Sequence, residues 1–347
     1  MSVLYVLAAI VILGLIVAVH EFGHYIAGRL CGIGILEYSI GFGPRLLGFE
    51  RGGIKYSLRL IPLGGYCAFL GEDEGMDDPR AMRNQPVWKR LVTTAAGPLM
   101  NFVLAFLLMI VFYNAFDVYQ SAPVLYEVVE GSAAQEAGLE AGDVIVSVNG
   151  ERLTCDPLGQ AQLISTIRAA GAQEVSLEID RGGELLKKTL VPEYNEQDQA
   201  YQIGILLGTV PVRLNFVQSL QQSGYAMLNM STMMVDALRQ MFTSKEVIEQ
   251  TMGPVGIIST VSQDMRQGAD MVLNWAVVIS LNLGIMNLLP VPGLDGGRIL
   301  FLIIEGIRRK PIPVEKEAWV HAGGLLLLLG LIVVITFRDV ARIFTGG

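Results

Sequence analysis

Four stretches of the chain are apolar almost without a break, and each is long enough to cross a lipid bilayer. A transmembrane helix needs about 20 predominantly apolar residues. The pattern predicts four such helices, at residues 3–27, 95–116, 272–291 and 320–338. The first lacks a basic leader, and its removal would separate it from the histidines at its end. We therefore expect it to be retained rather than cleaved as a signal peptide.

Between the second and third stretches the pattern becomes that of a soluble domain. Apolar and polar residues alternate over residues 144–148, and the Asn149-Gly150 pair that follows is the strongest short signal for a hairpin turn. Residues 175–179 alternate in the same way before a turn at Gly182-Gly183, and residues 158–170 have helical spacing. These elements predict a small domain with both strands and a helix.

The run from Gly131 to Ile145 resembles the body of a permuted PDZ domain of the kind found in bacterial proteases. PDZ domains bind extended peptides by adding a strand to a sheet edge, so the resemblance implies a peptide ligand. A spacer domain that only limits access to another site is equally compatible with these residues. The sequence leaves both interpretations open.

The predicted fold is a polytopic α-helical membrane protein. It has four transmembrane helices, a membrane-dipping β-hairpin region and an inserted α+β PDZ-like extracytoplasmic domain. Its expected parts are a first membrane half at 1–116 with the hairpin region at 35–70, the PDZ-like domain at 117–212, a helical connecting segment at 213–271 and a second membrane half at 272–347.

Composition supports a lipid environment. Only 17% of the residues are charged and 52% are hydrophobic, whereas charged residues make up about 25% of a typical soluble domain. This deficit excludes intrinsic disorder. The net charge of −8 also disfavours nucleic acid as a partner, because phosphate binding needs a cationic surface.

The distribution of charge predicts the orientation, since lysine and arginine near the ends of spans favour the cytoplasm. Nine basic residues lie between residues 25 and 90, and five lie between residues 292 and 319. By contrast, residues 117–271 carry 9 basic and 20 acidic side chains, a net charge of −11. We expect the two basic connections inside, with both termini and the inserted domain outside.

Cysteine usage points away from redox chemistry. The chain has three cysteines, Cys31, Cys67 and Cys155, which is an odd number with wide separations. They provide neither a disulfide framework nor the CxxC spacing of a structural zinc site.

The first apolar stretch ends in His20-Glu21-Phe22-Gly23-His24. On a helix, residues four apart share a face, so the two histidines can bind one metal ion with Glu21 beside it. This is the arrangement of zinc hydrolases, in which the carboxylate takes a proton from water. The alternative is a polar helix end without a metal. Ionisable groups at membrane depth are energetically costly and usually mark a functional site, which favours the metal.

A catalytic zinc ion has three protein ligands, so a third must come from elsewhere. The remaining histidine, His321, lies beside Trp319 where an interfacial residue is expected. Asp295 is the better candidate, because two prolines and three glycines interrupt the apolar pattern over residues 287–297, and broken backbone at this depth is tolerated only around a protein or polar cavity. A helix cap is the alternative role for Asp295.

Asn287 begins the same broken stretch. Its amide could donate a hydrogen bond to a developing oxyanion or hold the substrate backbone. A hydrogen bond between helices is the alternative role for this side chain.

Taken together, these motifs resemble the site-2 protease family, in its bacterial RseP and RasP branch. The resemblance rests on His20 to His24, on residues 287–297 and on the intervening PDZ-like domain. It extends to further motifs in the same order along the chain, which are Gly41-Phe42-Gly43, Leu63-Gly64-Gly65-Tyr66, Ala95-Ala96-Gly97-Pro98 with Asn101-Phe102, and Gly253-Pro254-Val255-Gly256. Only one PDZ-like domain can be fitted, where the RseP type has two, and this favours the shorter RasP-like form.

The resemblance implies a zinc metalloendopeptidase of the bacterial cytoplasmic (inner) membrane. In that case His20, His24 and Asp295 bind Zn²⁺, Glu21 is the catalytic acid-base residue and Asn287 assists in substrate binding. The implied substrates are single-span membrane proteins, such as anti-sigma factors or signal-peptide remnants, cut within the lipid bilayer towards its cytoplasmic side.

Two other classes of function remain as alternatives. A non-catalytic membrane adaptor would bind peptides through the PDZ-like domain and use zinc only for architecture, which predicts a closed site with four ligands. A transporter would have repeat-like halves, and none is evident in the sequence.

Overall fold

The computed structural model describes residues 3–72, 76–241 and 253–345. The chain forms two compact units. One unit, here called the membrane unit, combines Met1–Phe112 with Phe216–Gly347, and the other, here called the insert, is Tyr113–Asn215.

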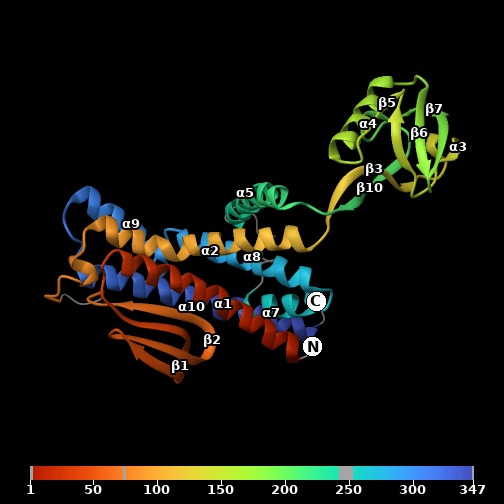
Figure 1. Cartoon of the computed structure of the whole chain (residues 1–347). Helices are drawn as coiled ribbons and strands as arrows, with labels where there is room; N and C mark the ends of the chain where they lie inside the picture. The colour runs from red at the N-terminus through yellow and green to blue at the C-terminus, as the bar shows by residue number, and fades with distance from the viewer. Residues whose placement is uncertain (1–2, 73–75, 242–252, 346–347) are drawn as a thin grey trace. The chain divides into compact units, whose positions relative to one another are not determined.

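Four helices of the membrane unit are long and apolar enough to cross a bilayer, counted over the described residues. They are α1 (Val3–Leu30), α2 (Val87–Ala115), α8 (Ala269–Leu288) and α10 (Val314–Thr345). Figure 1 shows them side by side, with both chain termini near one end of this bundle. The four predicted transmembrane helices are therefore confirmed.

Helix α2 begins several residues before the predicted start. The apolar pattern identifies only the part of a helix that lipid would cover, and α2 continues past it through Trp88-Lys89-Arg90 to Val87, directly after Pro86. Proline fixes φ and lacks an N–H, so it is well suited to the position before a helix.

A further helix, α9 (Asp295–Arg308), follows the broken stretch and was not predicted. It lies at the opposite end of the bundle from the two termini (Figure 1). Its 14 residues are too few to span a bilayer, and its apolar positions cover one face only, so a search for long apolar runs misses it.

The predicted hairpin region forms one pair of long, bent strands, β1 (Ile35–Arg51) and β2 (Ile54–Phe69). They are joined at Gly52-Gly53, where φ is +60° and +76°, a conformation that glycine adopts without a Cβ clash. Residues 37–40 are paired along both edges: Ile40 lies opposite Gly65 on one side and Leu58 on the other. The two strands thus fold back into a small sheet, and residues 65–69 form one of its edges.

The tip of this sheet is apolar and exposed. Leu46, Leu47 and Phe49 of β1, with Leu60 and Ile61 of β2, are about half or more exposed in the absence of lipid. Such a surface is unfavourable in water and favourable in a bilayer. This agrees with the predicted membrane-dipping hairpin.

The insert is the predicted domain of strands and a helix. Its main sheet has the strand order β10-β3-β4-β6-β7. These strands are β3 (Val118–Val128), β4 (Val144–Val148), β6 (Val175–Arg181), β7 (Glu184–Leu190) and β10 (Ile205–Val212), with β5 (Glu151–Arg152) paired to β4. Helix α4 (Pro157–Ala170) packs Leu163 into a core that includes Leu125, Ile145, Leu177 and Ile179.

The turns of the insert follow the sequence prediction. Asn149 and Gly150 have φ of +50° and +83°, as a two-residue hairpin turn between β4 and β5 requires. The short elements α3 (Ala133–Glu136), β8 (Glu193–Asn195) and β9 (Ala200–Gln202) complete the unit.

A groove of about 260 Å³ lies between α4 and residues 200–207. It is lined by Ile164 and Ile167 of α4 and by Ile205 and Leu207 of β10, the strand at the end of the sheet order. A peptide added as a strand would lie against β10 here. The peptide ligand expected for this domain stays a prediction.

Among the described residues, two helices lie between the insert and α8. Helix α5 (Phe216–Met241) follows the insert, and α7 (Pro254–Asp264) packs against α1 and α10. Asp339 of α10 accepts hydrogen bonds from the backbone N–H groups of Gly253 and Gly256 at 3.2 and 2.8 Å, which anchors the start of α7. The rest of the predicted connecting segment, residues 242–252, lies outside the described residues.

Candidate metal centre

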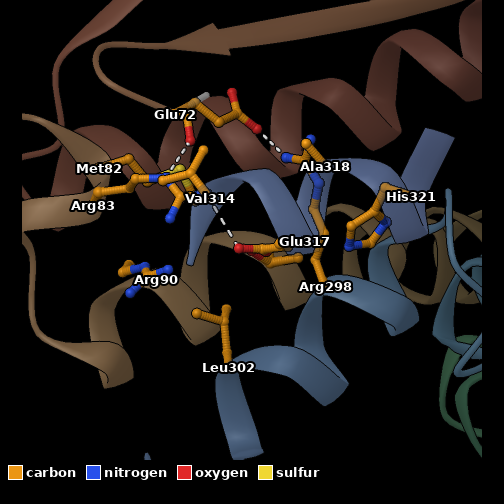
Figure 2. Close-up of a pocket in the computed structure, with 11 residues that line it drawn as sticks. Glu72, Met82, Arg83, Arg90, Arg298, Leu302, Val314, Glu317, Ala318 and His321 are labelled. Atoms are coloured by element: carbon orange, nitrogen blue, oxygen red, sulfur yellow. Dashed lines mark hydrogen bonds and ion pairs between the residues drawn. The ribbon is translucent and has the colours of Figure 1, made fainter. Parts of the chain in front are cut away.

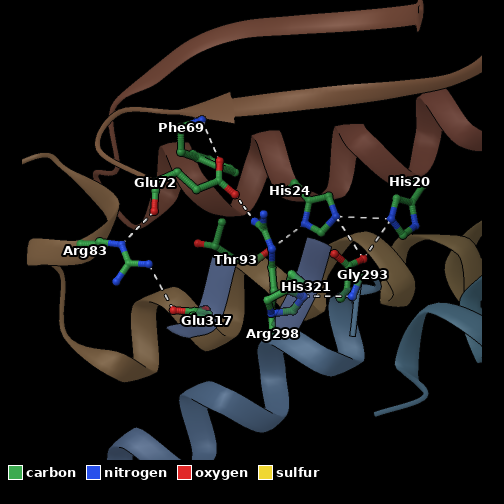
Figure 3. Close-up of polar contacts among 11 residues, drawn as sticks. His20, His24, Phe69, Glu72, Arg83, Thr93, Gly293, Arg298, Glu317 and His321 are labelled. Atoms are coloured by element: carbon green, nitrogen blue, oxygen red, sulfur yellow. Dashed lines mark hydrogen bonds and ion pairs between the residues drawn. The ribbon is translucent and has the colours of Figure 1, made fainter. Parts of the chain in front are cut away.

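Helix α1 presents His20 and His24 on one face, as the spacing of four residues predicts. Both side chains are buried, and their Nε2 atoms lie 3.3 Å apart. Figure 3 shows the two rings next to each other, with dashed contacts leading from both rings to one point. Two imidazole nitrogens therefore converge inside the membrane unit.

Asp295 approaches the same point from α9. Its Oδ2 lies 3.1 Å from Nε2 of His20 and 3.4 Å from Nε2 of His24. Asp295 is the first residue of α9 and faces the histidines, whereas the N-cap of this helix is Leu294, so the alternative role of Asp295 as a helix cap is wrong. Burial alone would raise the pKa of this carboxyl, but the two imidazoles lower it below its ordinary value.

The broken stretch brings Asp295 into place because its glycines allow close backbone packing. A Cβ at Gly296 would collide with the carbonyl oxygens of Leu288 and Leu289, and one at Gly297 would lie 2.5 Å from the oxygen of Val291. Only glycine fits where the chain turns from α8 into α9. The prolines and glycines of the sequence motif thus have a direct structural role.

These three side chains have the chemistry of a zinc site. Ligand atoms of His20, His24 and Asp295 all lie within 4.8 Å of one another. Asp295 Oδ2 is buried, and the two imidazole Nε2 atoms face it at 3.1 and 3.4 Å. Two imidazole nitrogens and one carboxylate oxygen form a donor set that catalytic zinc uses, with a fourth position left for water or substrate. The residues present therefore fit a zinc ion.

Helix α2 supports the histidines from the other side. The main-chain oxygen of Thr93 lies 2.9 Å from His24 Nδ1, which fixes the orientation of that ring. A Cβ at Gly97 would collide with the same imidazole. Asn101, four residues further along α2, lies 3.2 Å from His20 Nδ1 through its side-chain amide.

The three donors line a cavity of about 500 Å³. Glu21 is half-buried in this cavity. Gly65 of β2 packs beside it, so that a Cβ added at Gly65 would lie 3.1 Å from Cγ of Glu21. Asn287, near the end of α8, lines the cavity as well. The cavity is large enough for a short extended peptide segment.

Cys67 of β2 also borders the cavity. Burial, and then the neighbouring Glu21 carboxylate, raises the pKa of its thiol. Cys67 is not one of the side chains whose ligand atoms converge with His20, His24 and Asp295 among the described residues.

A second, polar cavity lies beside the first (Figure 2). Glu72 and Arg298 line both cavities and form an ion pair with each other. Two more ion pairs tie the surrounding elements together, Arg83 with Glu317 at 3.1 Å and Arg90 with Glu305 at 2.7 Å. These pairs join the chain after β2 to α9 and α10, and α2 to α9.

His321 does not belong to the metal group. Its Nδ1 accepts a hydrogen bond from the backbone N–H of Gly293 at 2.9 Å, and its ring lies near that of Phe301 at a tilt of 46°. It lines the second cavity rather than the first. Among the described residues, the metal group consists of His20, His24 and Asp295.

Comparison with known proteins identifies the family. The sequence model of "Peptidase family M50" matches residues 8–331, which is nearly the whole chain. The chain belongs to peptidase family M50. It is a zinc metalloprotease, and the site-2 protease resemblance seen in its motifs is confirmed.

Related sequences align over the full length of this M50 metalloprotease. A Synechocystis protein named "Putative zinc metalloprotease slr1821" is 36% identical over 349 residues, covering 98% of this chain and 95% of its own. The "Regulator of sigma-W protease RasP" of Bacillus subtilis is 28% identical over 420 residues, covering 98% and 99% of the two chains.

Among solved structures, a PDZ domain of an SdrC-like protein from Listeria monocytogenes is similar to part of the M50 chain. It is 19% identical, with a TM-score of 0.22, and the alignment covers 26% of this chain and 90% of that one.

The residues predicted for the M50 site all lie around one cavity. His20, His24 and Asp295 meet, and Glu21 and Asn287 line the same space. The sequence alone suggests no role for Thr93, Gly97 and Asn101, although Gly97 and Asn101 belong to one of the motifs shared with the family. Their spacing of four residues on a transmembrane helix was a usable signal, because it places them on one face.

Proposed function

We propose that this zinc metalloprotease hydrolyses peptide bonds within the transmembrane segments of single-span membrane proteins. The observation that carries the proposal is the depth of the metal group. His20 lies 15 residues after the start of the span Tyr5–Leu30 and 10 residues before its end. At 1.5 Å per residue, it lies roughly 22 Å from the first end and about 15 Å from the second. A substrate bond must therefore enter the bilayer to reach it.

The three converging side chains would hold the zinc ion. His20 and His24 supply imidazole nitrogens, and Asp295 supplies a carboxylate oxygen. When bound, zinc activates a water molecule and polarises the carbonyl of the scissile bond. The adaptor alternative required a fourth protein ligand, and the described residues offer three.

Glu21 is proposed as the acid-base residue. Its carboxylate takes the proton of the attacking water and later returns it to the amine nitrogen of the leaving chain, so that no proton is lost or gained overall. Asn287 of α8 lines the same cavity, and its amide would hold the substrate backbone.

The hairpin supplies a surface for an extended substrate. Residues 65–69 of β2 line the metal cavity, and this segment is an edge of the small sheet. A transmembrane helix has its carbonyls paired internally and must be unwound before hydrolysis. Pairing with a strand edge would replace those internal hydrogen bonds by intermolecular ones.

We propose that the protein lies in the bacterial cytoplasmic membrane with the insert and both termini outside. The basic residues gather in the connections that hold the hairpin and α9, and residues 117–271, which include most of the insert, carry a net charge of −11. The metal group then lies towards the cytoplasmic side, nearer the end of α1 that leads to the hairpin. Suitable substrates are single-span proteins, such as anti-sigma factors or signal-peptide remnants, trimmed outside beforehand.

The test compares Glu21→Gln with the wild type in purified full-length protein. We expect zinc content to stay at one ion per chain and cleavage of a single-span substrate to fall by at least about 100-fold, the range for loss of a general base. Glu50→Gln, which makes the same change on an exposed hairpin position, is the matched control and should cleave normally. A Glu21→Gln protein that keeps its zinc and cleaves at the wild-type rate would exclude the proposed role.

A further inference from the structure

A neutral imidazole can bind zinc through Nε2 only when its proton is on Nδ1. His24 meets this condition, because its Nδ1 faces the main-chain oxygen of Thr93 at 2.9 Å, and a carbonyl oxygen can only accept a hydrogen bond. Figure 3 shows Thr93 next to the His24 ring. The tautomer of His24 is therefore set by the backbone of α2.

His20 has a different partner, a side-chain amide. Asn101 Nδ2 lies 3.2 Å from His20 Nδ1. In this arrangement the amide donates to Nδ1, and the ring proton is on Nε2, directed at Asp295 Oδ2 at 3.1 Å. A ring in this form cannot bind a metal through Nε2.

The other atom of the same amide lacks a partner. Asn101 Oδ1 is buried and has no hydrogen bond among the described residues. A half-turn about the Cβ–Cγ bond exchanges the nitrogen and oxygen of an asparagine amide. After this turn, Oδ1 would accept a hydrogen bond from Nδ1–H of His20, and Nε2 would be free to face the metal.

We propose that Asn101 is a positioning residue, which fixes the metal-binding tautomer of His20 when zinc is bound. The inference rests on the proposed zinc site and concerns a residue outside the ligand set. Asn101 acts through His20 and touches neither the substrate nor the metal. With Nδ2 rather than Oδ1 facing His20, the same side chain favours the other tautomer, which pairs with Asp295.

The surroundings of Asn101 leave the amide little freedom except this half-turn. Its side chain is fully buried, and its main-chain oxygen accepts a hydrogen bond from Ser280 of α8 at 2.9 Å. Gly97, one turn earlier, lies directly against His24. One face of α2 thus holds both histidines, with a backbone acceptor for one and an amide for the other.

The test measures zinc affinity by competition with a chelator in purified full-length protein, together with zinc content. Asn101→Leu replaces the amide by a side chain of nearly the same size that has no hydrogen-bond acceptor. We expect the zinc affinity of this variant to fall by about 10- to 100-fold, the range for removal of the hydrogen-bond partner of a metal-binding histidine. Asn101→Asp can accept from Nδ1–H, so its affinity should stay within about threefold of the wild type or exceed it. Wild-type affinity in Asn101→Leu would overturn the proposal, and so would equal losses in the two variants.

Two controls separate this inference from the proposed function. Asn287→Leu makes the same change elsewhere in the cavity and should keep wild-type zinc affinity. His20→Ala should lose the metal; if it does not, the zinc site itself is wrong and the role of Asn101 falls with it. The melting temperature of each metal-free variant reports folding, so that a loss of affinity with an unchanged metal-free protein is specific to the site.

Discussion

At the scale of residues, the metal centre depends on space as much as on ligand chemistry. His24 can turn its Nε2 towards Asp295 because position 97 of α2 has no side chain, and Asp295 reaches the histidines because Gly296 lets the chain fold back on α8. A larger residue at either glycine would displace a ligand by more than a zinc site tolerates. The glycines are thus as necessary to the site as the ligands.

The sequence identifies the ligands but not their supports. His20 and His24 are four apart on one helix, so local geometry alone predicts their convergence. Asp295 could be inferred from the missing third ligand and the interrupted helix. The contact between Asn101 and His20 joins positions 81 apart in the chain and depends on how α1 packs against α2, which no local pattern determines.

At the scale of elements, long apolar helices and hairpin turns followed from the sequence, while α9 and the double pairing of β1 did not. Hydrophobic periodicity reports which face of a segment is buried. It does not report which strand pairs with which. Residues 37–40 pair on both sides because β2 bends around them, and this bend is a tertiary feature.

The edge segment of β2, residues 65–69, is predicted to pair with an extended substrate. Ala68→Pro fixes φ and removes the N–H of a residue paired with Glu37 of β1, which disturbs the edge strand that borders the metal cavity. If substrate binds as an added strand, turnover of a transmembrane substrate should fall at least about tenfold, while zinc content stays unchanged. Ala68→Val, which keeps the N–H, is the matched control.

The measurement is the rate of cleavage in detergent micelles, analysed with the zinc content of each variant. Equal rates for Ala68→Pro and Ala68→Val would show that strand pairing at this edge has no part in catalysis. A loss in both variants would instead indicate that the side chain, rather than the backbone, is what matters at position 68.

At the scale of the whole molecule, topology and charge point to the same orientation. In the proposed orientation, the hairpin and α9 lie on one side of the membrane, and the insert and both termini lie on the other, as the four candidate spans among the described residues require. The basic connections fall on the first side and the acidic insert falls on the second. The charges and the helix count together support the proposal that the metal group lies towards the cytoplasm.

The cysteines of the chain allow a direct test of this orientation. Cys155 of the insert is exposed, while Cys31 and Cys67 are buried. A membrane-impermeant maleimide should label Cys155 in cells whose cytoplasmic membrane is intact, and Cys155→Ser should abolish the labelling. Introducing Arg309→Cys into the Cys155→Ser protein places a thiol after α9, which should react only after lysis. Labelling in the reverse order would refute the proposed orientation.

The central claim is that one zinc ion is held by side chains of α1 and α9. Anomalous diffraction at the zinc absorption edge, from crystals of the full-length protein, tests it most directly. We predict a single peak with His20 Nε2, His24 Nε2 and Asp295 as ligands, at the zinc–ligand distances of about 2.0–2.2 Å that these atoms adopt. A peak at other residues, or no peak at this position in a protein that cleaves its substrate, would contradict the account.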